Sequence, residues 1–439
     1  MAVTASSGTA SEATDVIDRE ALLDRYQATR DATERLAAVL APEDQVVQTM
    51  PDVSPTKWHR AHVTWFFETF LLGELAPGHE PFHPGFGYLF NSYYEQVGER
   101  HPRAERGLIS RPTVAEVGEY RRAVDAAMAG LVAAVDERTW TGLAAPRIEL
   151  GVHHEQQHQE LLLMDIKHVL SCNPLAPAYV PDECDPAVDL TPQGWVDLEG
   201  GLVEVGGEPD GFSFDNEAPR HPVFLQPYRL ANRLVTNGEW LTFIDDGGYE
   251  RAELWLSDGW AAVQAEGWGS PLHWRREGDA WRIFTLAGER PVDLAEPVCH
   301  VSHYEADAFA RWAGCRLPLE AEWEHAVAGQ AVEGNLLDPH APATGAPHPR
   351  PAPAAAGGGV RQAFGDVWEW TSSPYVAYPG FRPAEGAIGE YNGKFMSNQV
   401  VLRGGSCLTP RDHVRPTYRN FFPPSARWQA GGLRLAADA

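Results

Sequence analysis

The sequence predicts an N-terminal four-helix bundle followed by a C-terminal α+β domain with much loop and little regular structure. Three observations predict this division. In the first part of the chain, apolar residues recur every three or four positions, which is the period of an amphipathic helix. A stretch rich in Pro, Ala and Asp, from Asn173 to Pro192, then has the composition of a linker. Beyond it lie twelve of the fifteen tryptophans, frequent glycines and short apolar runs.

The length of the chain supports more than one domain, because 439 residues exceed what one small core holds. We expect a disordered tail over 1–14, a helical bundle with metal ligands over 15–175, a linker over 176–195 and the second domain over 196–439. The tail is rich in Ser, Thr and Ala and lacks the basic and apolar segments of a signal peptide.

Composition and charge exclude several classes of partner. The net charge of −26 argues against nucleic acid and anionic membranes, which bind clustered Lys and Arg. No apolar run approaches the ~20 residues that span a bilayer. The five cysteines form no CxxC pair, so neither a disulfide framework nor a zinc ribbon is indicated, and a reducing cytoplasm fits best. The sequence leaves open whether the chain forms a homo-oligomer.

The first three helices follow from apolar spacing and capping signals. Residues 16–40 carry one amphipathic helix, and Ser54 followed by Pro55 predicts the N-cap and first position of a second. Residues 73–112 show no periodicity; a loop of this length inside a compact domain is usually functional, and it holds Tyr93 and Tyr94. The third helix follows a capping box that begins at Thr113.

The fourth helix, predicted over 148–170, carries the chemistry of the bundle. His154 and His158 are four residues apart and therefore share one helix face, whereas His153 points about 100° away. His62 on the second helix, facing this pair, would complete a three-histidine metal site with open coordination positions. His59 lies near the same face, so spacing alone does not choose between the two. Core or surface histidines are the alternative interpretation.

The same stretch also contains His154-Glu155-x-x-His158, the pattern of zinc metalloproteases, in which the Glu is the general base. That function needs a third ligand downstream. The candidates Glu160, Asp165 and His168 stand at no familiar offset, so the protease remains a distant alternative.

The second half contains few regular elements. Short apolar runs at 201–205 and 400–405 predict strands, and helices are expected over 305–312 and 319–327. An Ala/Pro/Gly tract over 338–359 predicts an exposed loop. Most of the tryptophans are expected to fill the core.

Five phrases in the second half resemble the formylglycine-generating-enzyme (sulfatase-modifying-factor) family, and they occur in the family's order. The resemblance implies a C-type-lectin-like fold. The copper-binding cysteine pair of that family is replaced here by residues such as Val414 and Tyr418, which argues against formylglycine synthesis. The phrases are Pro297–Ser302, Arg316–Ala326, Gly365–Trp370, Leu402–Ser406 and Gly432–Ala436.

The first half, with Ser54–His62 and the stretch His154-Glu-Gln-Gln-His158, is similar to the DinB-like bundle of the ergothioneine sulfoxide synthases. Both halves together cover almost the whole chain. The resemblance implies a cytoplasmic non-haem Fe(II) enzyme that uses O2 to join a thiol to the imidazole of Nα-trimethylhistidine. It places iron on His62, His154 and His158.

The resemblance also implies substrate-binding and catalytic residues. Gln157 and the pair Asn420-Phe421 match positions that hold the histidine-derived substrate, and an aromatic face suits a trimethylammonium group. Tyr93 and Tyr94 match a pair that donates a proton or hydrogen atom during sulfoxidation. Buried tyrosines that merely find a hydrogen-bond partner are the alternative.

The thiol donor follows less directly from the sequence. Arg103 and Arg106 can hold a carboxylate, because Arg offers a bidentate geometry, and Arg419 is a weaker candidate. Phe422 stands where γ-glutamylcysteine-using relatives carry a charged residue, so the sequence favours free cysteine as donor. The alternatives are γ-glutamylcysteine, an ovothiol- or selenoneine-type reaction, and a module that binds without turnover. A structural calcium near Asp366 is left open.

Overall fold

The computed structural model describes residues 18–181, 192–208, 211–338, 345–352 and 359–439. The tail expected over 1–14, half of the linker expected over 176–195 and part of the loop over 338–359 lie outside these residues. The four cysteines among the described residues, Cys172, Cys299, Cys315 and Cys407, are free.

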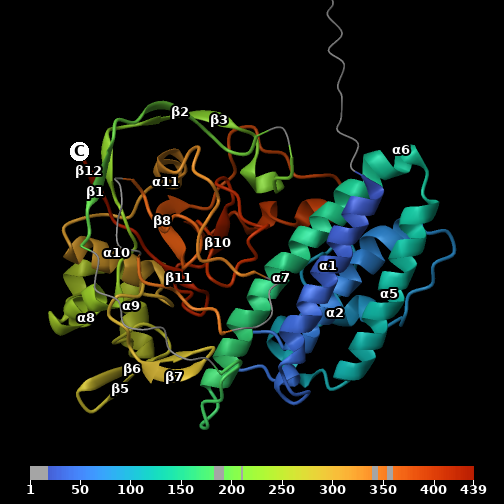
Figure 1. The fold of residues 1–439 in the computed structure, drawn as a ribbon, viewed down its shortest axis with the longest axis horizontal. Helices are drawn as coiled ribbons and strands as arrows, with labels where there is room; N and C mark the ends of the chain where they lie inside the picture. The colour runs from blue at the N-terminus through green and yellow to red at the C-terminus, as the bar shows by residue number, and fades with distance from the viewer. Residues whose placement is uncertain (1–17, 182–191, 209–210, 339–344, 353–358) are drawn as a thin grey trace, which may run out of the picture.

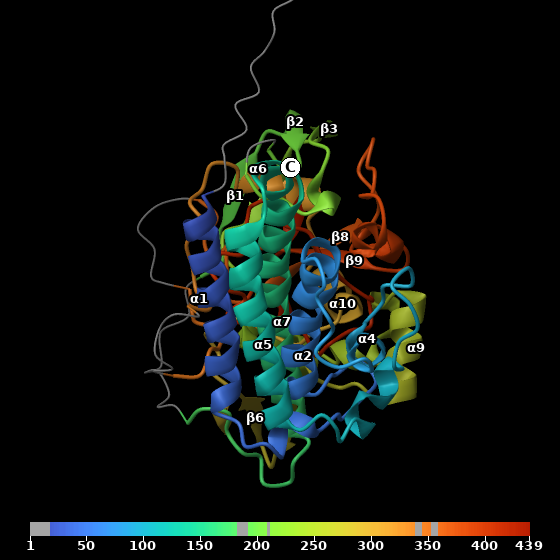
Figure 2. The same cartoon turned by 90° about the vertical axis from the view of Figure 1, so that its right-hand side faces the viewer.

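Four long helices run side by side in the N-terminal half (Figure 2) and confirm the predicted bundle. Helix α7 contacts α1 and α2, and α2 also packs against α5. The core between them is rich in large apolar side chains such as Tyr26, Trp65, Phe67 and Met128. The helices are α1 (Arg19–Ala38), α2 (Thr56–Phe67), α5 (Val114–Ala134) and α7 (Ala145–Ser171).

The start of α2 differs from the prediction by one residue. Pro55 is the N-cap and Thr56 the first helical residue, with no side chain capping the helix. Ser54 has other partners: its backbone N–H donates to Asp165 Oδ2 (2.8 Å) and its Oγ accepts from Arg106 (2.9 Å). The residue expected to cap α2 therefore joins the start of that helix to α7 through its backbone and to the loop residue Arg106 through its side chain.

The connection from α2 to α5 is more ordered than its lack of periodicity indicates. The helix continues through a π-helical turn, η2 (Glu68–Leu72), into α3 (Gly73–Leu75). The long loop then contains α4 (Phe86–Phe90) and η3 (Arg103–Leu108). The capping box at Thr113 is confirmed. Helix α6 (Glu137–Thr139) and the π-turn η4 (Trp140–Ala144) lead into α7.

The second half is an irregular α+β domain (Figure 1), and its described residues form four small sheets. The strands expected at 201–205 and 400–405 and the two helices around 305–327 are confirmed, with shifted ends. The sheets are β1 (Trp195–Leu198), β4 (Tyr228–Ala231) and β12 (Ala436–Asp438); β10 (Asn420–Phe422), β9 (Val400–Arg403), β8 (Trp368–Pro374) and β11 (Gly431–Gly432); β2 (Gly201–Val205) and β3 (His221–Leu225); and β5 (Trp274–Glu277), β6 (Ala280–Thr285) and β7 (Gly288–Pro291). The helices are α8 (Asn237–Asp245), α9 (Ser257–Glu266), α10 (His303–Trp312) and α11 (Glu320–Ala326).

Helix α7 is shared by both halves and lies along their boundary (Figure 1). Its apolar residues Leu162, Leu163 and Ile166 belong to one buried cluster with side chains of the second half, such as Phe284 and Trp428. Because of this placement, the histidine stretch of α7 contacts both halves of the molecule.

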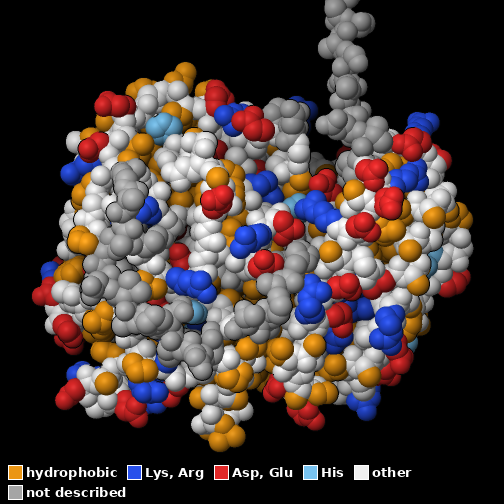
Figure 3. Space-filling view, viewed as in Figure 1, with side chains coloured by type: hydrophobic (Ala, Val, Ile, Leu, Met, Phe, Trp, Pro, Cys, Tyr) orange, Lys and Arg blue, Asp and Glu red, His pale blue; other side chains and the backbone are white. Residues whose placement is uncertain are grey.

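Within the part of the chain that the structure describes, no helix is long and apolar enough to cross a bilayer. On the face shown in Figure 3, acidic and basic side chains are interspersed and form no continuous basic patch.

Candidate metal centre and substrate site

The structure brings His62, His154 and His158 together in the core of the molecule. One nitrogen of each imidazole lies within 4.8 Å of the others, and the Nε2 atoms of His62 and His154 are 3.2 Å apart. All three side chains are buried. Among the described residues no other group of three His, Cys, Asp or Glu side chains meets this spacing.

His62 is fixed in a single orientation. Its Nδ1–H donates to the carbonyl oxygen of Phe90 (2.6 Å), which leaves Nε2 free to face the other two histidines. Trp58 and Trp65 stack on the ring, with centroids 4.7 and 5.6 Å away. A hydrogen bond at the remote nitrogen fixes the tautomer in the way expected of a metal ligand.

His158 is oriented by the neighbouring histidine that the sequence left in competition with His62. His59 Nδ1 lies 2.9 Å from His158 Nδ1, and its Nε2 lies 3.0 Å from Asp165 Oδ2. Asp165 also accepts from the indole of Trp428 (3.1 Å). With His59 donating to the carboxylate, its Nδ1 accepts from His158, which keeps His158 Nε2 available to a metal.

His154 approaches the centre because α7 and α2 pack closely at Gly151. A Cβ on Gly151 would lie 2.4 Å from the ring of Phe67, so a larger residue would push the helices apart one turn before His154. The ring of Phe66 contacts His154, with centroids 4.7 Å apart. The Nδ1 atom of His154 is buried without a hydrogen-bond partner among the described residues.

The three imidazoles are held neutral. Burial lowers the pKa of each of them, and that of His154 falls to about 3. Neutral imidazoles with converging lone pairs fit a borderline divalent metal such as Fe(II) or Zn(II). Three protein ligands leave further coordination positions for substrate, which is the pattern of a catalytic site.

The position of Glu155 contradicts the protease interpretation. Its carboxylate accepts from Arg30 (2.9 Å), Arg121 (2.9 Å) and Thr33 (2.7 Å), on the side of α7 that faces the bundle interior. Burial alone would raise the pKa of Glu155, but the two guanidiniums lower it to about 2. A carboxylate committed to two arginines cannot act as general base on a metal-bound water.

Gln157 projects from α7 toward the second half and is held between two tyrosines. Its Nε2 donates to the hydroxyl of Tyr418 (2.7 Å), and its Oε1 accepts a short hydrogen bond from Tyr391. The ring of Tyr391 meets His154 edge-on, with centroids 5.6 Å apart. The amide next to His158 therefore has a fixed orientation at the metal centre.

Tyr93 and Tyr94 lie next to each other, near Tyr391. Their rings stack at 4.6 Å, and their hydroxyl oxygens are 3.5 Å apart. Tyr94 is fully buried beside Trp65, which in turn stacks on His62. Burial raises the pKa of both phenols, so both carry their protons at neutral pH.

The structure does not bring Asn420 and Phe421 to the metal centre. Asn420 Oδ1 accepts from the backbone N–H of Phe421 (2.9 Å), and Phe421 stacks between Tyr375 and Phe395, with centroids 4.0 and 5.9 Å away. Two rings therefore pack against Phe421, and none of these contacts is with the three histidines. Phe422 packs edge-on against Trp428 (5.4 Å).

The three candidate arginines lie in different environments. Four of the five N–H donors of Arg419 are used by Glu320 (2.9 and 3.0 Å) and by two backbone carbonyls, and the side chain is buried away from the histidines. Arg103 is exposed at the surface, where it donates to the carbonyl of Asp52 (2.5 Å). Arg106 is buried over the ring of Trp58 (3.4 Å), and its Nε has no partner among the described residues.

Comparison with known proteins identifies the family. The sulfatase-modifying factor enzyme 1-like domain matches residues 181–439, and the DinB superfamily matches residues 25–162. The hercynine oxygenase of Mycobacterium tuberculosis is 34% identical, over 88% of this chain and 92% of that protein. The chain belongs to the hercynine oxygenase family. The hercynine oxygenase of Mycolicibacterium smegmatis is 33% identical, over 96% of this chain and 100% of its own length.

Membership in the hercynine oxygenase family makes the chain an oxygenase and confirms the predicted fold class, a DinB-like bundle joined to a formylglycine-generating-enzyme-like domain. The formylglycine-generating enzyme of Streptomyces coelicolor is 30% identical over only 60% of this chain, the part that corresponds to the second half. Tyr418, which lies in this second half, is the side chain that holds Gln157.

A cleft between the start of α7 and the second half opens beside Tyr391. It has a volume of about 310 Å³, and its walls combine aromatic rings with carboxylates. In a hercynine oxygenase family member such a wall suits a cationic substrate group. The lining includes Glu149, Phe212, Phe214, Asp215, Tyr391 and Asn392.

The surroundings of Asp366 do not resemble a calcium site. Both of its carboxylate oxygens accept from N–H donors: Asn335 Nδ2 (2.7 Å) and Arg350 N (2.8 Å) at Oδ1, and Gln362 Nε2 (3.2 Å) at Oδ2. Calcium needs six to eight oxygen ligands. We therefore do not assign a calcium to this position.

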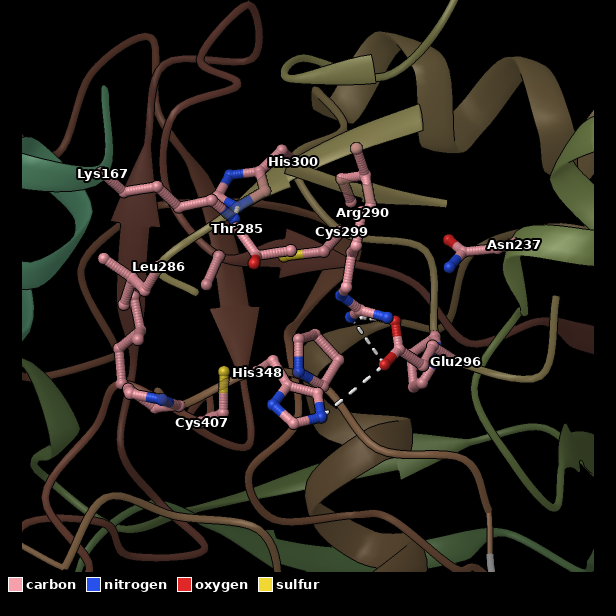
Figure 4. Close-up of a pocket in the computed structure, with 16 residues that line it drawn as sticks. Lys167, Asn237, Thr285, Leu286, Arg290, Glu296, Cys299, His300, His348 and Cys407 are labelled. Carbon is pink, nitrogen blue, oxygen red and sulfur yellow. Dashed lines mark hydrogen bonds and ion pairs between the residues drawn. The ribbon is translucent and has the colours of Figure 1, made fainter. Parts of the chain in front are cut away.

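A second cavity lies at the far end of α7 and is separate from the histidine centre (Figure 4). Lys167 reaches into it from α7 and lies 2.7 Å from His300 Nε2, and burial lowers the pKa of this lysine. Arg290 and Glu296 form an ion pair on the opposite wall (2.7 Å). The cysteines Cys299 and Cys407 complete the lining.

Sequence reasoning missed Tyr391, Tyr418 and His413, which contact the site from the second half. The sequence singles out Tyr418 only as a residue near the place where the formylglycine-generating-enzyme family has a cysteine pair. Tyr391 lies in a stretch without periodicity, between two short 3-10 turns, where no local pattern marks a functional side chain. Only the packing of that stretch against α7 reveals its role.

Proposed function

We propose that this member of the hercynine oxygenase family is an Fe(II)-dependent sulfoxide synthase of ergothioneine biosynthesis. It would use O2 to join a thiol to the imidazole of hercynine (Nα-trimethylhistidine). The observation that carries the proposal is the buried centre of three neutral histidines with Gln157 held beside it. The four free cysteines in the described residues support a cytoplasmic location.

Iron fits the donor set of His62, His154 and His158, because three neutral imidazoles retain Fe(II) and leave positions for substrates. When bound, the iron would supply O2 activation and coordination of the imidazole and thiol. The protein contributes orientation: Phe90 fixes His62, and His59 with Asp165 fixes His158. Large apolar rings around the centre exclude bulk water.

The imidazole substrate would bind along Gln157 with its cationic group in the cleft. Tyr391 and Tyr418 hold the amide, so its orientation is set before the substrate arrives. Phe212 and Phe214 offer aromatic edges and faces, and Asp215 offers negative charge, to a trimethylammonium group. This placement replaces the role first expected of Phe421.

The thiol donor would present its carboxylate to Arg106. A buried guanidinium with an unpartnered Nε favours an anionic ligand. The uncharged Phe422 supports free cysteine, as the sequence indicates. The nearby positive charges of Arg103 and Arg100, which lower the pKa of Arg106 after burial, favour the more anionic γ-glutamylcysteine as the second candidate.

Two places in the site could deliver a proton to the reacting oxygen. Tyr94, beside Tyr93, is one; Tyr391, whose ring contacts His154, is the other. All three phenols are protonated, because burial raises their pKa. The ring of Tyr391 contacts a metal-site histidine directly, so we propose Tyr391 as the donor, with its hydroxyl turning from Gln157 to the reacting oxygen. The Tyr93–Tyr94 pair is the second candidate.

A competition assay tests the proposal. Anaerobically purified, Fe(II)-loaded protein would receive hercynine, O2 and equal amounts of cysteine and γ-glutamylcysteine, and mass spectrometry would identify the products. We expect a sulfoxide adduct of hercynine. A cysteinyl adduct would support free cysteine as the donor, as the uncharged Phe422 indicates. A γ-glutamyl adduct would support γ-glutamylcysteine, as the positive charges around Arg106 indicate. No adduct with either thiol, despite stoichiometric iron, would reject the proposal and favour an ovothiol- or selenoneine-type reaction.

The same assay on Tyr391→Phe and Tyr94→Phe separates the two candidates for the proton donor. We expect Tyr391→Phe to lower the ratio of sulfoxide adduct to oxidised thiol by about 10²-fold or more, the usual contribution of a general acid. Tyr94→Phe should change that ratio less. An unchanged ratio in Tyr391→Phe would return the role to the Tyr93–Tyr94 pair.

A further inference from the structure

A continuous series of hydrogen bonds joins the surface of α1 to Gln157. Arg25 Nη2 lies 2.9 Å from His153 Nε2, and His153 Nδ1 lies 3.0 Å from His413 Nδ1. His413 Nε2 is then 3.1 Å from the hydroxyl of Tyr418, which accepts from Gln157. The series crosses from the bundle into the second half.

The first residue of the series fixes the direction of the three hydrogen bonds that lead from it to Tyr418. A guanidinium has only N–H donors, so Arg25 must donate and His153 Nε2 must accept. The proton of neutral His153 is then on Nδ1 and is donated to His413 Nδ1. The proton of neutral His413 is consequently on Nε2 and is donated to the oxygen of Tyr418. Protonating either imidazole would place two N–H groups against each other.

The surroundings keep this arrangement neutral and buried. His153 and His413 are 3% and 1% exposed, and Phe212 stacks on His153 with centroids 3.9 Å apart. The guanidinium of Arg415 lies 5.2 Å from the ring of Tyr418, and burial together with Arg415 lowers the pKa of His413. No carboxylate hydrogen-bonds to either imidazole among the described residues.

Tyr418 therefore receives two hydrogen bonds, from His413 Nε2–H and from Gln157 Nε2–H. Both acceptor positions of its oxygen are filled, and its own proton has no acceptor among the described residues. A buried O–H without an acceptor is costly, and a ligand acceptor would satisfy it. The guanidinium of Arg415, 5.2 Å from the ring, is already paired with Glu217, so the free O–H of Tyr418 is what selects a ligand that carries an acceptor, such as a carboxylate.

We propose that the hydroxyl of Tyr418 donates a hydrogen bond to the carboxylate of the amino-acid-derived imidazole substrate, and that Arg25, His153 and His413 are positioning residues that keep this proton free. The inference rests on the proposed function for the identity of the substrate. The direction of the series rests only on the hydrogen-bond chemistry of the chain. If the direction were reversed, Tyr418 would donate to His413 and lose its proton for the ligand.

Nitrogen-15 NMR of histidine-labelled, Zn(II)-loaded protein tests the direction without any turnover. We expect the Nδ1–H tautomer for His153 and the Nε2–H tautomer for His413. Arg25→Met should remove the fixed tautomers, and Arg25→Lys, which keeps a donor, should retain them. Finding His413 as the Nδ1–H tautomer in the wild-type protein would overturn the inference.

Calorimetric binding of hercynine to the same Zn(II)-loaded protein tests the contact. We expect Tyr418→Phe to weaken binding by about 10- to 100-fold, as for a lost hydrogen bond to a charged group. Arg25→Met should also weaken hercynine binding, whereas Arg25→Lys should bind as the wild type does. The double variant Arg25→Met/Tyr418→Phe should bind hercynine no more weakly than Tyr418→Phe alone. Gln27→Met, an exposed substitution on the same helix, is the control.

The two measurements separate failure of the inference from failure of the proposed function. Binding within twofold of wild type in Tyr418→Phe would overturn the contact, whatever the tautomers are. In the Fe(II) enzyme, the expected loss appears as a raised KM for hercynine with the KM for the thiol unchanged. A wild-type protein that shows the expected tautomers but does not bind hercynine would instead reject the proposed substrate.

Discussion

Two buried glutamates on α7, five positions apart, have opposite environments. Glu155 faces the bundle and is paired with two guanidiniums. Glu160 faces the second half and accepts only from neutral donors: the indole of Trp368 (2.7 Å) and the hydroxyls of Ser406 and Thr409 (both 2.8 Å). Charge lowers the pKa of Glu155 to about 2 against the effect of burial, whereas burial raises the pKa of Glu160.

The contrast shows how one helix serves two purposes. The side toward the bundle contains ion pairs that hold the helices together, and the side toward the second half contains neutral groups that hold the two halves against each other. The metal histidines lie between these sides and carry no structural ion pair. We therefore expect substitutions on α7 to separate metal binding, bundle stability and contact between the halves.

The largest expected effect is on metal binding. His154→Ala should abolish binding of Fe(II) because it removes one of three ligands, whereas His153→Ala should retain the metal. Metal content by elemental analysis checks this. The thermal midpoint of the metal-free His154→Ala protein should shift by only about 2–4 °C, as for a loss of about 1 kcal/mol. Full iron occupancy in His154→Ala would show that the ligand set is wrong.

The next effect concerns the bundle. Glu155→Gln removes the negative charge that pairs with Arg30 and Arg121. It should lower the free energy of unfolding by about 3 kcal/mol. Because the folded pKa of Glu155 is lowered, its contribution is present above the ordinary pKa of about 4.3 and is lost as the pH falls from about 5 toward 2. The difference in free energy of unfolding between wild type and Glu155→Gln should therefore become smaller as the pH falls over that range.

Urea unfolding of the metal-free proteins between pH 3 and 7 measures this difference. Glu137→Gln is a matched control, because Glu137 forms an exposed ion pair with Arg19 and should contribute about 0–1 kcal/mol. A difference for Glu155→Gln that does not change with pH would mean that its charge is not what stabilises the bundle.

The sequence was sufficient to predict the four long helices and the pair His154 and His158, since both depend on local periodicity, whereas His62 came from the family resemblance. The four-residue spacing of His154 and His158 places them on one face in any α-helix. The choice between His62 and His59 was different: it depends on the carbonyl of Phe90 and the carboxylate of Asp165, which come from a loop and from another turn of α7. No pattern within α2 contains that information.

The substrate residues of the second half show the same limit more strongly. Asn420 and Phe421 match a family motif, yet the structure covers Phe421 with two rings and places Tyr391 and Tyr418 beside Gln157. These contacts join residues more than two hundred positions apart, in a part of the chain with little regular structure. Long-range packing of irregular segments has no period in the sequence, so it could not be predicted.

The smallest effect completes the comparison of the two glutamates. Glu160→Gln keeps one acceptor oxygen, and Ser406 and Thr409 can reorient their hydroxyls, so the cost should be about 1 kcal/mol. Because the folded pKa of Glu160 is raised, its contribution is fully present below the ordinary pKa and is lost as the pH rises through the folded value. The difference between wild type and Glu160→Gln should therefore shrink as the pH rises from about 4, opposite to the trend for Glu155→Gln. Urea unfolding over the same pH range measures the free-energy difference for both variants. If the two differences change with pH in the same direction, the arginines beside Glu155 do not determine the direction of the pH dependence.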